Sequence, residues 1–271
     1  MTAGAESNPA VELREVELAY HRAAPVVMNV SGTFEPGTIT AILGPNAVGK
    51  STLLKAIIGA LPPRNGEILV RGKPPHDRRG RDLASRIVYV AQRPTVAADF
   101  TVREVVRLGR YALPANEARI EAALAELELE HLADRPVTEL SVGQQQRAAL
   151  GRAIAQLGDE SVLVLDEPTA SMDLRHAAAA YRVLKHAAQR GATVILAMHD
   201  LTAVTAAADR AWLMGPPEGR EELEEIAAAT LRAAGSVDEI LRPRVLEPVF
   251  GLPFEELQLG SGRRVLLPAG R

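Results

Sequence analysis

A glycine-rich stretch that ends in a lysine and two hydroxyl residues is the part of this sequence best suited to chemistry. It consists of Gly44, Pro45, Asn46, Ala47, Val48, Gly49, Lys50, Ser51 and Thr52. The spacing fits G-x-x-x-x-G-K-[ST], a loop whose backbone N–H groups surround an anion. Lys50 supplies a compact positive charge for the β- and γ-phosphates of a nucleotide, and the Ser51 hydroxyl is a ligand for Mg²⁺. The alternative is a glycine-rich turn that happens to carry a lysine.

The flanks of this phosphate loop favour the nucleotide interpretation. Residues 38–43 are mostly apolar and β-branched, which predicts a buried strand, and residues 53–58 have helical character. A strand, a glycine loop and a helix start direct several N–H groups and the positive end of a helix dipole toward one point. The sequence therefore predicts an anion cradle, which indicates a nucleotide but does not define a task.

A pair of acidic residues follows another apolar run. Asp166 and Glu167 come directly after residues 162–165, which predict a buried strand. In nucleoside triphosphatases a carboxylate at this position holds Mg²⁺ through its shell, a role that we expect for Asp166. Glu167 is placed to take a proton from the attacking water as general base. Such a pair alone would more often be a solvated loop, and the phosphate loop favours the catalytic interpretation.

Two polar residues follow further predicted strands. Gln92 comes after residues 87–91, and its uncharged amide can touch Mg²⁺ or the water without changing the charge balance. His199 follows residues 193–198, and an imidazole there can hydrogen-bond the γ-phosphate. The other histidines lack such a placement, and we interpret all of them as solvated residues: His21, His76, His131, His176 and His186.

A second helix start able to bind an anion is predicted near residue 141. Ser141 sits at an N-cap-like position before a helix over residues 145–157. One chain cannot easily bring two helix starts to the same phosphate. Two chains packed head to tail can do so, each completing the nucleotide site of the other.

Composition excludes several classes of protein. The net charge of −3 argues against a nucleic-acid partner, because such proteins usually need a positive field. With no cysteine, disulfides, thiolate catalysis and cysteine-bound metals are excluded. No apolar run approaches the roughly 18 residues of a membrane span. We therefore expect a cytosolic chain that only another chain could bring to a membrane.

The elements around these residues predict an α/β core. Extended segments at 11–18 and 26–34 precede the phosphate loop, with a tight turn at 64–66 and a short strand at 67–70 after it. Residues 93–158 show only helical patterns, including a capping box that begins at Thr101. The remaining predicted elements are a strand at 162–165, a helix at 175–189, a strand at 193–198, a last short strand at 211–214, an acidic helix near 220–234 and a final hairpin around 260–267. Their alternation implies a parallel sheet with crossover helices.

These motifs, in this order, resemble those of ATP-binding cassette (ABC) ATPases, the motor subunits of membrane transporters. The matches are Walker A at 44–52, the Q-loop at Gln92, the signature motif at 140–144, Walker B at 162–167, the D-loop at 171–173 and the H-loop at His199. The resemblance further implies nucleotide contacts for Tyr20, which would stack on adenine, and for Ser141, Gly143, Gln144 and Asp173. Ser141 and Gly143 would contact the γ-phosphate of the ATP held by a partner chain. Two departures are Ala47, where the family often has glycine, and Val142, which replaces the first signature glycine.

The resemblance covers nearly the whole chain and implies its fold and partners. The expected fold is an α/β P-loop NTPase core with an antiparallel β subdomain and an all-helical insert. The expected division is a flexible tail at 1–10, an ATPase domain at 11–250 with its helical subdomain at about 93–158, and a C-terminal extension at 251–271. ATP and Mg²⁺ are the implied cofactors. The implied partners are a second copy, an integral-membrane permease dimer and, indirectly, a periplasmic or lipoprotein substrate-binding protein, at the cytoplasmic face of the membrane.

The cargo is indicated only by finer resemblances. Residues 101–110, 171–176 and 246–251 look similar to the ATPases of iron–siderophore, haem and cobalamin importers. Two alternatives stay open. One is an importer ATPase for another nutrient, such as zinc or manganese. The other is a soluble ABC ATPase that clamps nucleic acid or a ribosome.

Overall fold

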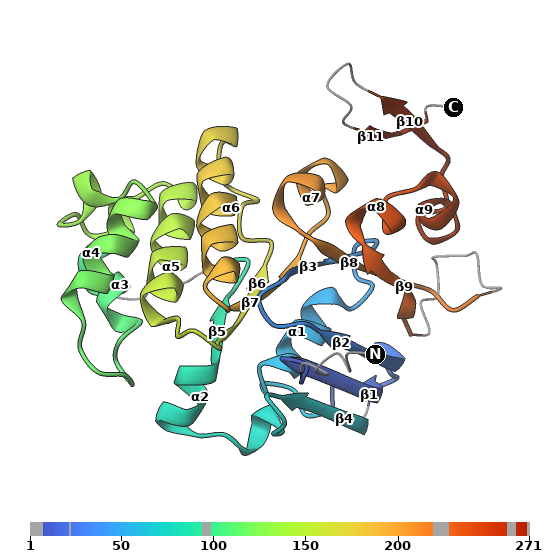
Figure 1. Cartoon of the computed structure of the whole chain (residues 1–271), viewed down its shortest axis with the longest axis horizontal. Coiled ribbons are helices and arrows are strands. Elements are labelled where there is room, and N and C mark those ends of the chain that lie inside the picture. Colours follow the sequence, from blue (N-terminus) through green and yellow to red (C-terminus); the bar gives the residue numbers. More distant parts are fainter. Residues whose placement is uncertain (1–7, 22, 94–98, 219–227, 259–263, 270–271) are drawn as a thin grey trace, which may run out of the picture.

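A computed structural model describes residues 8–21, 23–93, 99–218, 228–258 and 264–269. Figure 1 shows a central sheet with helices packed around it, a second sheet beside it and a group of helices at one end. This is the α/β core with an antiparallel sheet and a helical insert that the sequence predicts. No helix in the described residues is both long and apolar enough to cross a membrane.

Six strands of the described chain form the central sheet, in the order β5-β6-β7-β3-β8-β9. They are β5 (Ile87–Val90), β6 (Val162–Asp166), β7 (Thr193–Ala197), β3 (Ile39–Leu43), β8 (Arg210–Gly215) and β9 (Thr230–Ser236). All neighbours pair in parallel except β8 and β9. Every residue of β3, β6 and β7 is buried, because layers of structure cover both faces of the sheet. Their continuous apolar runs in the sequence follow from this burial.

The second sheet is antiparallel and is built from β1 (Val11–Leu18), β2 (Val27–Phe34) and β4 (Asn65–Val70). Helix α1 (Lys50–Ile57) packs against strands of both sheets. Phe34 of the antiparallel sheet stacks on Trp212 of the central sheet, with ring centroids 4.2 Å apart. These contacts enclose one hydrophobic core between the two sheets and fix the position of the helix that follows the phosphate loop.

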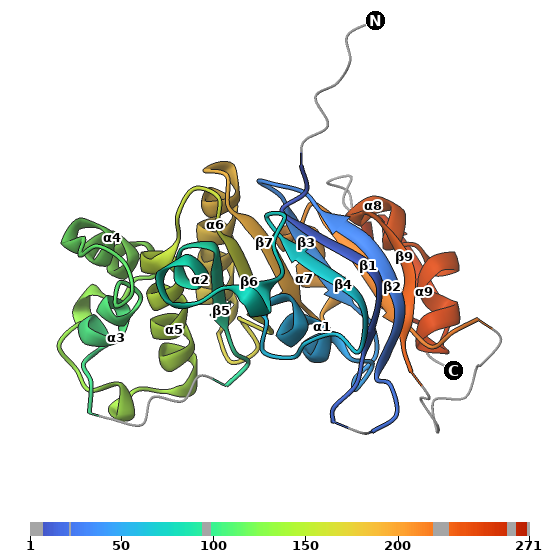
Figure 2. The same ribbon diagram turned by 90° about the horizontal axis from the view of Figure 1, so that it is seen from below.

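The helical insert contains α3 (Val102–Leu108), α4 (Glu117–Glu126) and α5 (Val142–Gln156) in its described residues. Thr101 begins α3 with the predicted capping box, in which Glu104 is the reciprocal partner. Figure 2 shows this insert at one end of the molecule and helices α8 (Val237–Ile240) and α9 (Pro243–Phe250) at the other, with the two sheets between them. Residues 94–98, which the sequence predicts to belong to the insert, lie outside the described residues.

The remaining helices cover the central sheet, and a small hairpin follows them. Helix α6 (Leu174–Gln189) and helix α7 (Leu201–Ala207) connect the parallel strands. The predicted final hairpin is present as β10 (Phe254–Gln258) and β11 (Arg264–Pro268). Phe254 and Leu266 of the hairpin are buried in the main core, so the hairpin is anchored to the rest of the fold.

Two predictions about local structure are wrong. Residues 230–236 form β9 and not the end of an acidic helix, so 211–214 is not the last strand of the core; residues 219–227 lie outside the described chain. Pairing with the buried strand β8 outweighs the helical propensity of this alanine-containing segment. The turn expected at 64–66 is instead the start of β4. Gly66 has a positive φ of 77°, and a Cβ there would lie 2.3 Å from the Arg14 carbonyl oxygen, so glycine is needed where β4 pairs with the irregular part of β1.

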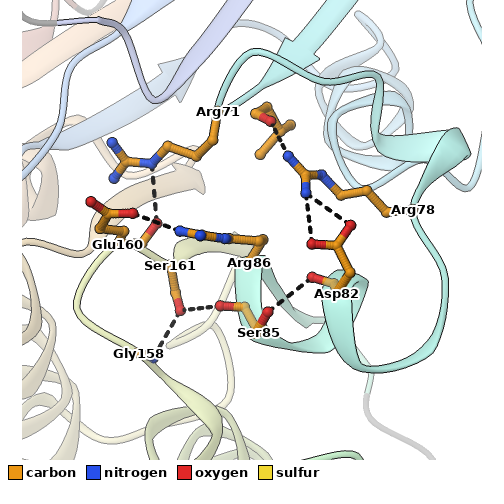
Figure 3. Close-up of polar contacts among 9 residues, drawn as sticks. Arg71, Arg78, Asp82, Ser85, Arg86, Gly158, Glu160 and Ser161 are labelled. Carbon is orange, nitrogen blue, oxygen red and sulfur yellow. Dashed lines mark hydrogen bonds and ion pairs between the residues drawn. The ribbon is translucent and has the colours of Figure 1, made fainter.

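Helix α2 (Gly80–Arg86) was not predicted, because it carries no buried residue and so leaves no apolar pattern. Polar contacts hold it in place, as Figure 3 shows. Arg86 pairs with Glu160 at 2.6 Å, and the Ser161 hydroxyl donates to the Ser85 carbonyl at 3.1 Å. The helix leads directly into the edge strand β5. Its polar contacts therefore fix the strand that precedes Gln92.

Candidate functional site

The predicted site residues converge at one edge of the central sheet. Strands β3, β5, β6 and β7 run in parallel, so the residues that follow their carboxyl ends share that edge. A cavity of about 450 Å³ lies there. Its lining consists of Asn46, Ala47, Gly49, Lys50, Ser51, Thr52, Gln92, Glu167 and His199. The phosphate loop, the Q-loop glutamine, the candidate base and the H-loop histidine are thus brought together as predicted.

The phosphate loop leads into α1 with the backbone N–H groups of the first helical turn left without side-chain partners. Gly44, Ala47 and Gly49 all have positive φ angles, of 143°, 62° and 96°. Gly49 is the N-cap of α1, and no side chain accepts a hydrogen bond from the first turn of that helix. Unpaired N–H groups at a helix start, together with the helix dipole, favour a bound anion. The start of α1 therefore has the chemistry of a phosphate site.

Lys50 lies across this loop. Its Nζ donates to the carbonyl oxygens of Gly44 and Pro45, both at 2.8 Å. Burial lowers the pKa of the Lys50 ammonium, and the nearby carboxylates of Glu167 and Asp166 oppose that shift. The cation is thus held at the cavity by the loop backbone, and it can exchange these carbonyl partners for phosphate oxygens.

Ser51 and Asp166 supply oxygen donors beside Lys50. Asp166 ends β6 and is buried. Burial raises the pKa of the Asp166 carboxyl, whereas a hydrogen bond from the Ser51 hydroxyl lowers it. A carboxylate and a hydroxyl are hard ligands of the kind Mg²⁺ takes when nucleotide phosphates complete its shell. No cluster of three or more acidic or histidine side chains suited to a metal occurs in the described residues.

Glu167 is held between two other strand ends. Gln92 Nε2 donates to Glu167 Oε2 at 2.7 Å, and His199 Nδ1 lies 3.1 Å from Glu167 Oε1. The Glu167 backbone has a φ of 46°, an uncommon value that is associated with functional positions. Each carboxylate oxygen therefore has one protein contact. The carboxylate can accept a proton from a water once one of these contacts is exchanged for that water.

Tyr20 lies beside the phosphate-loop helix. Its hydroxyl is 3.3 Å from the Thr52 hydroxyl and 3.4 Å from Lys55 Nζ. The Lys55 ammonium also lies 5.6 Å from the centre of the Tyr20 ring. Tyr20 is partly exposed, so its ring is accessible to a base. Stacking of Tyr20 on adenine stays a prediction. Lys55 was missed by sequence reasoning, although its place one turn after the phosphate loop is a usable signal.

The signature residues do not line this cavity. Ser141 begins α5 with a full capping box: its hydroxyl accepts from Gln144 N at 3.3 Å, and Gln144 Oε1 accepts from Ser141 N at 3.0 Å. Gly143 packs against the backbone of the D-loop, where a Cβ would lie only 2.4 Å from the Ser171 carbonyl oxygen. The predicted contact of Ser141 and Gly143 with a nucleotide cannot come from this cavity within one chain. It stays a prediction for a second copy.

The D-loop aspartate has a local partner that was not expected. Asp173 is the N-cap of α6 and accepts hydrogen bonds from the backbone N–H of His176 at 2.9 Å and from His176 Nδ1 at 2.7 Å. These hydrogen bonds, the backbone one first, hold the pKa of Asp173 below its ordinary value. The interpretation of His176 as a merely solvated residue is therefore wrong. Its spacing of three from an N-cap aspartate is the signal that was overlooked.

Comparison with known proteins adds to this geometry. Residues 27–170, more than half of the chain, match the ABC transporter family. The hemin import ATP-binding protein HmuV of Rhodopseudomonas palustris strain BisA53 is 33% identical over 253 residues, covering 90% of this chain and 89% of that protein. The zinc transport system ATP-binding protein TroB of Treponema pallidum strain Nichols is 39% identical over 215 residues, covering 76% and 78%.

Among solved structures, a chain from a metal-chelate type ABC transporter in an inward-facing conformation is similar. The TM-score is 0.75 at 25% identity, with 97% of this chain and 99% of that chain covered. The predicted fold class is therefore confirmed both by the architecture and by this neighbour. The chain belongs to the ABC transporter family, as one of the ATPase subunits that bind and hydrolyse ATP.

Proposed function

We propose that the chain powers an importer that takes up a metal chelate, such as haem, through a separate membrane permease. The observation that carries the ATPase part is the meeting of Lys50, Gln92, Glu167 and His199 in one cavity. The import part is supported by relatives named for hemin import and by the metal-chelate type neighbour. The chain would work at the cytoplasmic face of the membrane.

Each residue of the cavity has a role that its chemistry supports. Lys50 and the α1 start would bind the β- and γ-phosphates, and Ser51, Asp166 and Gln92 would hold Mg²⁺, which would neutralise charge on those phosphates. Glu167 takes the proton of the attacking water, and His199 contacts the γ-phosphate.

A second copy of the chain would complete each nucleotide site. The candidates for contact across that interface are Ser141, Gly143, Gln144 and Asp173, none of which lines the cavity of its own chain. Val142 and Leu174 beside them are 62% and 91% exposed. These large apolar side chains lie next to the residues proposed to contact a partner. Their exposure supports burial against that partner.

The helical insert offers a surface for the permease. A hollow of about 500 Å³ lies between α3 and α4, and Leu108 and Phe100 line it together with Tyr111, which is 89% exposed. Phe100 follows Gln92 along the chain, and Gln92 donates a hydrogen bond to Glu167. A helix of the permease seated there would be linked to Gln92 and through it to Glu167. The substrate-binding protein would act through the permease and would not touch this chain.

Zinc is the second candidate cargo, because a zinc-transport relative is 39% identical. The site does not discriminate between cargoes, since an ATPase subunit need not contact what is transported. Uptake of haem, a ferric siderophore and zinc by cells with and without this chain separates these cases. Loss of haem or siderophore uptake alone supports the proposal, and loss of zinc uptake alone contradicts it.

A soluble clamp on nucleic acid is the remaining alternative, and the net charge of −3 disfavours it. Co-purification tests the point. The tagged chain should retain a multi-helix membrane protein from detergent extracts and release no nucleic acid. Recovery of nucleic acid without any membrane protein would contradict the transport proposal.

A further inference from the structure

Gln146 is a buried amide that the mechanism above does not use. It lies in α5, two residues after Gln144, and is 1% exposed. Neither Oε1 nor Nε2 has a hydrogen-bond partner among the described residues. The neighbouring Gln145 differs, because its Nε2 donates to the carbonyls of Val137 and Leu140, both at 3.1 Å. A buried amide with nothing to bond is rare enough to require an explanation.

The helix geometry directs this amide toward the D-loop. A side chain on an α-helix leans over the turn that precedes it, and residues three apart share a face. The residue three before Gln146 is Gly143, whose Cα faces the Ser171 carbonyl so closely that a Cβ would lie 2.4 Å from the oxygen. The Gln146 side chain thus covers the turn on which the D-loop crosses α5. This crossing accounts for its burial in a helix that begins at the surface.

The D-loop carbonyl at this crossing also lacks a bond. Ser171 O accepts no hydrogen bond from any described residue, whereas the ends of the segment are fixed: Met172 N donates to Thr169 O at 3.0 Å, and Asp173 is tied to His176. An unpaired buried amide and an unpaired carbonyl thus occur at the same crossing of α5 and the D-loop.

We propose that Gln146 is a positioning residue that couples the signature helix to the D-loop of the same chain. In the closed, nucleotide-bound pair of chains its amide donates to the D-loop backbone, with Ser171 O as the acceptor. The unpaired amide then raises the free energy of the open state, so that pairing favours closure. A chain whose signature helix grips one nucleotide thereby sets the D-loop that faces the other site. This inference rests on the proposed paired ATPase.

The test compares Gln146→Met with Gln145→Met in the purified full chain. Both changes replace an amide by an apolar side chain of similar length. Gln146→Met should raise the thermal midpoint, because it removes an unpaired buried amide. It should also lower kcat about tenfold and bring the Hill coefficient for ATP toward 1, with the ATP affinity of the single chain unchanged. Gln145→Met should lower the thermal midpoint and leave the Hill coefficient as in the unsubstituted chain.

Two outcomes overturn the proposal. A lower thermal midpoint for Gln146→Met means that the amide is already paired in the open state. A kcat and Hill coefficient within twofold of the unsubstituted chain mean that the residue only fills space. Either result leaves the proposed function standing, since that function is tested on the unsubstituted chain, by ATP hydrolysis, uptake and co-purification.

Discussion

The starts of α1 and α5 are both anion-binding helix ends by position, yet they are built differently. The start of α1 is Gly49, in a left-handed conformation, and no side chain accepts from the N–H groups that follow. The start of α5 is Ser141, whose hydroxyl and the Gln144 amide satisfy each other's backbone N–H groups. At the first end no side chain satisfies an N–H group, whereas at the second the capping box satisfies two of them within the chain.

This difference separates two tasks: binding of the nucleotide by one chain and completion of that nucleotide site by a second chain. Lys50 and the uncapped start of α1 form a nucleotide site that one chain holds ready. In the proposed pair of chains, Ser141 would use its remaining hydrogen-bonding capacity on the nucleotide of another molecule. We therefore expect substitutions at α1 to change the affinity for ATP, and substitutions at α5 to change turnover by the pair of chains.

The largest effect on ATP affinity is expected at Lys50. Lys50→Ala should weaken ATP binding about 10–100-fold, because a hydrogen bond to a charged group contributes roughly 1.5–3 kcal/mol. Isothermal titration measures it. Lys185→Ala, on α6 and exposed, is the matched control and should change affinity less than about threefold. Equal losses for both variants would show that only the overall positive charge matters.

A smaller effect, on a different quantity, is expected at Ser141. Ser141→Ala removes one arm of the capping box, which costs about 1 kcal/mol of stability. It should lower turnover about tenfold while the ATP affinity of the isolated chain stays within twofold, a contrast that follows from completion by another molecule. Titration and steady-state kinetics on the same sample separate the two. A matching loss of affinity would place Ser141 at the nucleotide of its own chain.

Asp166 gives a prediction in which stability and activity move in opposite directions. Burial raises the pKa of this carboxyl, so the folded chain without nucleotide loses stability as pH rises through the unfolded pKa toward the folded one. Asp166→Asn should therefore stabilise the nucleotide-free chain by on the order of 1 kcal/mol at pH 7. Mg²⁺-dependent turnover should vanish. Urea unfolding at pH 7 and pH 4 checks the sign, because the gain should shrink at the lower pH.

The smallest effect is expected at Ala47, the departure within the phosphate loop. Its φ of 62° is a left-handed value that glycine adopts without strain. Ala47→Gly relieves that strain but adds freedom to the unfolded chain, so the net gain should stay below about 1 kcal/mol. ATP affinity should not change. A clear loss of affinity would mean that the alanine methyl group itself shapes the cradle.

Local signals in the sequence were sufficient for most of the nucleotide edge. The phosphate loop, the strand ends at Gln92, Asp166 and His199, and the N-cap at Ser141 each depend on residues a few positions apart. The phosphate loop, Gln92, Glu167 and His199 meet in one cavity because they follow parallel strands, whose carboxyl ends share an edge.

The misses depend on contacts distant in sequence. Strand β9 is stabilised by its antiparallel pairing with β8, and residues 230–236 carry no local pattern that predicts a strand. Helix α2 is held by Glu160 and Ser161, more than seventy residues away, without any apolar face of its own. The sequence around Gly66 predicts a turn because the close approach of Gly66 to Arg14 depends on strand pairing, which neither local sequence reveals.

The most direct test of the account is the mass of Glu167→Gln with ATP and Mg²⁺ in solution. The variant keeps the shape of the side chain but cannot accept the proton, so turnover should fall about 100-fold or more. Light scattering after size exclusion should then show a dimer with ATP and a monomer without it, and Glu160→Gln should remain an active control. A Glu167→Gln chain that binds ATP and stays monomeric would contradict the claim that each site is completed by a second molecule.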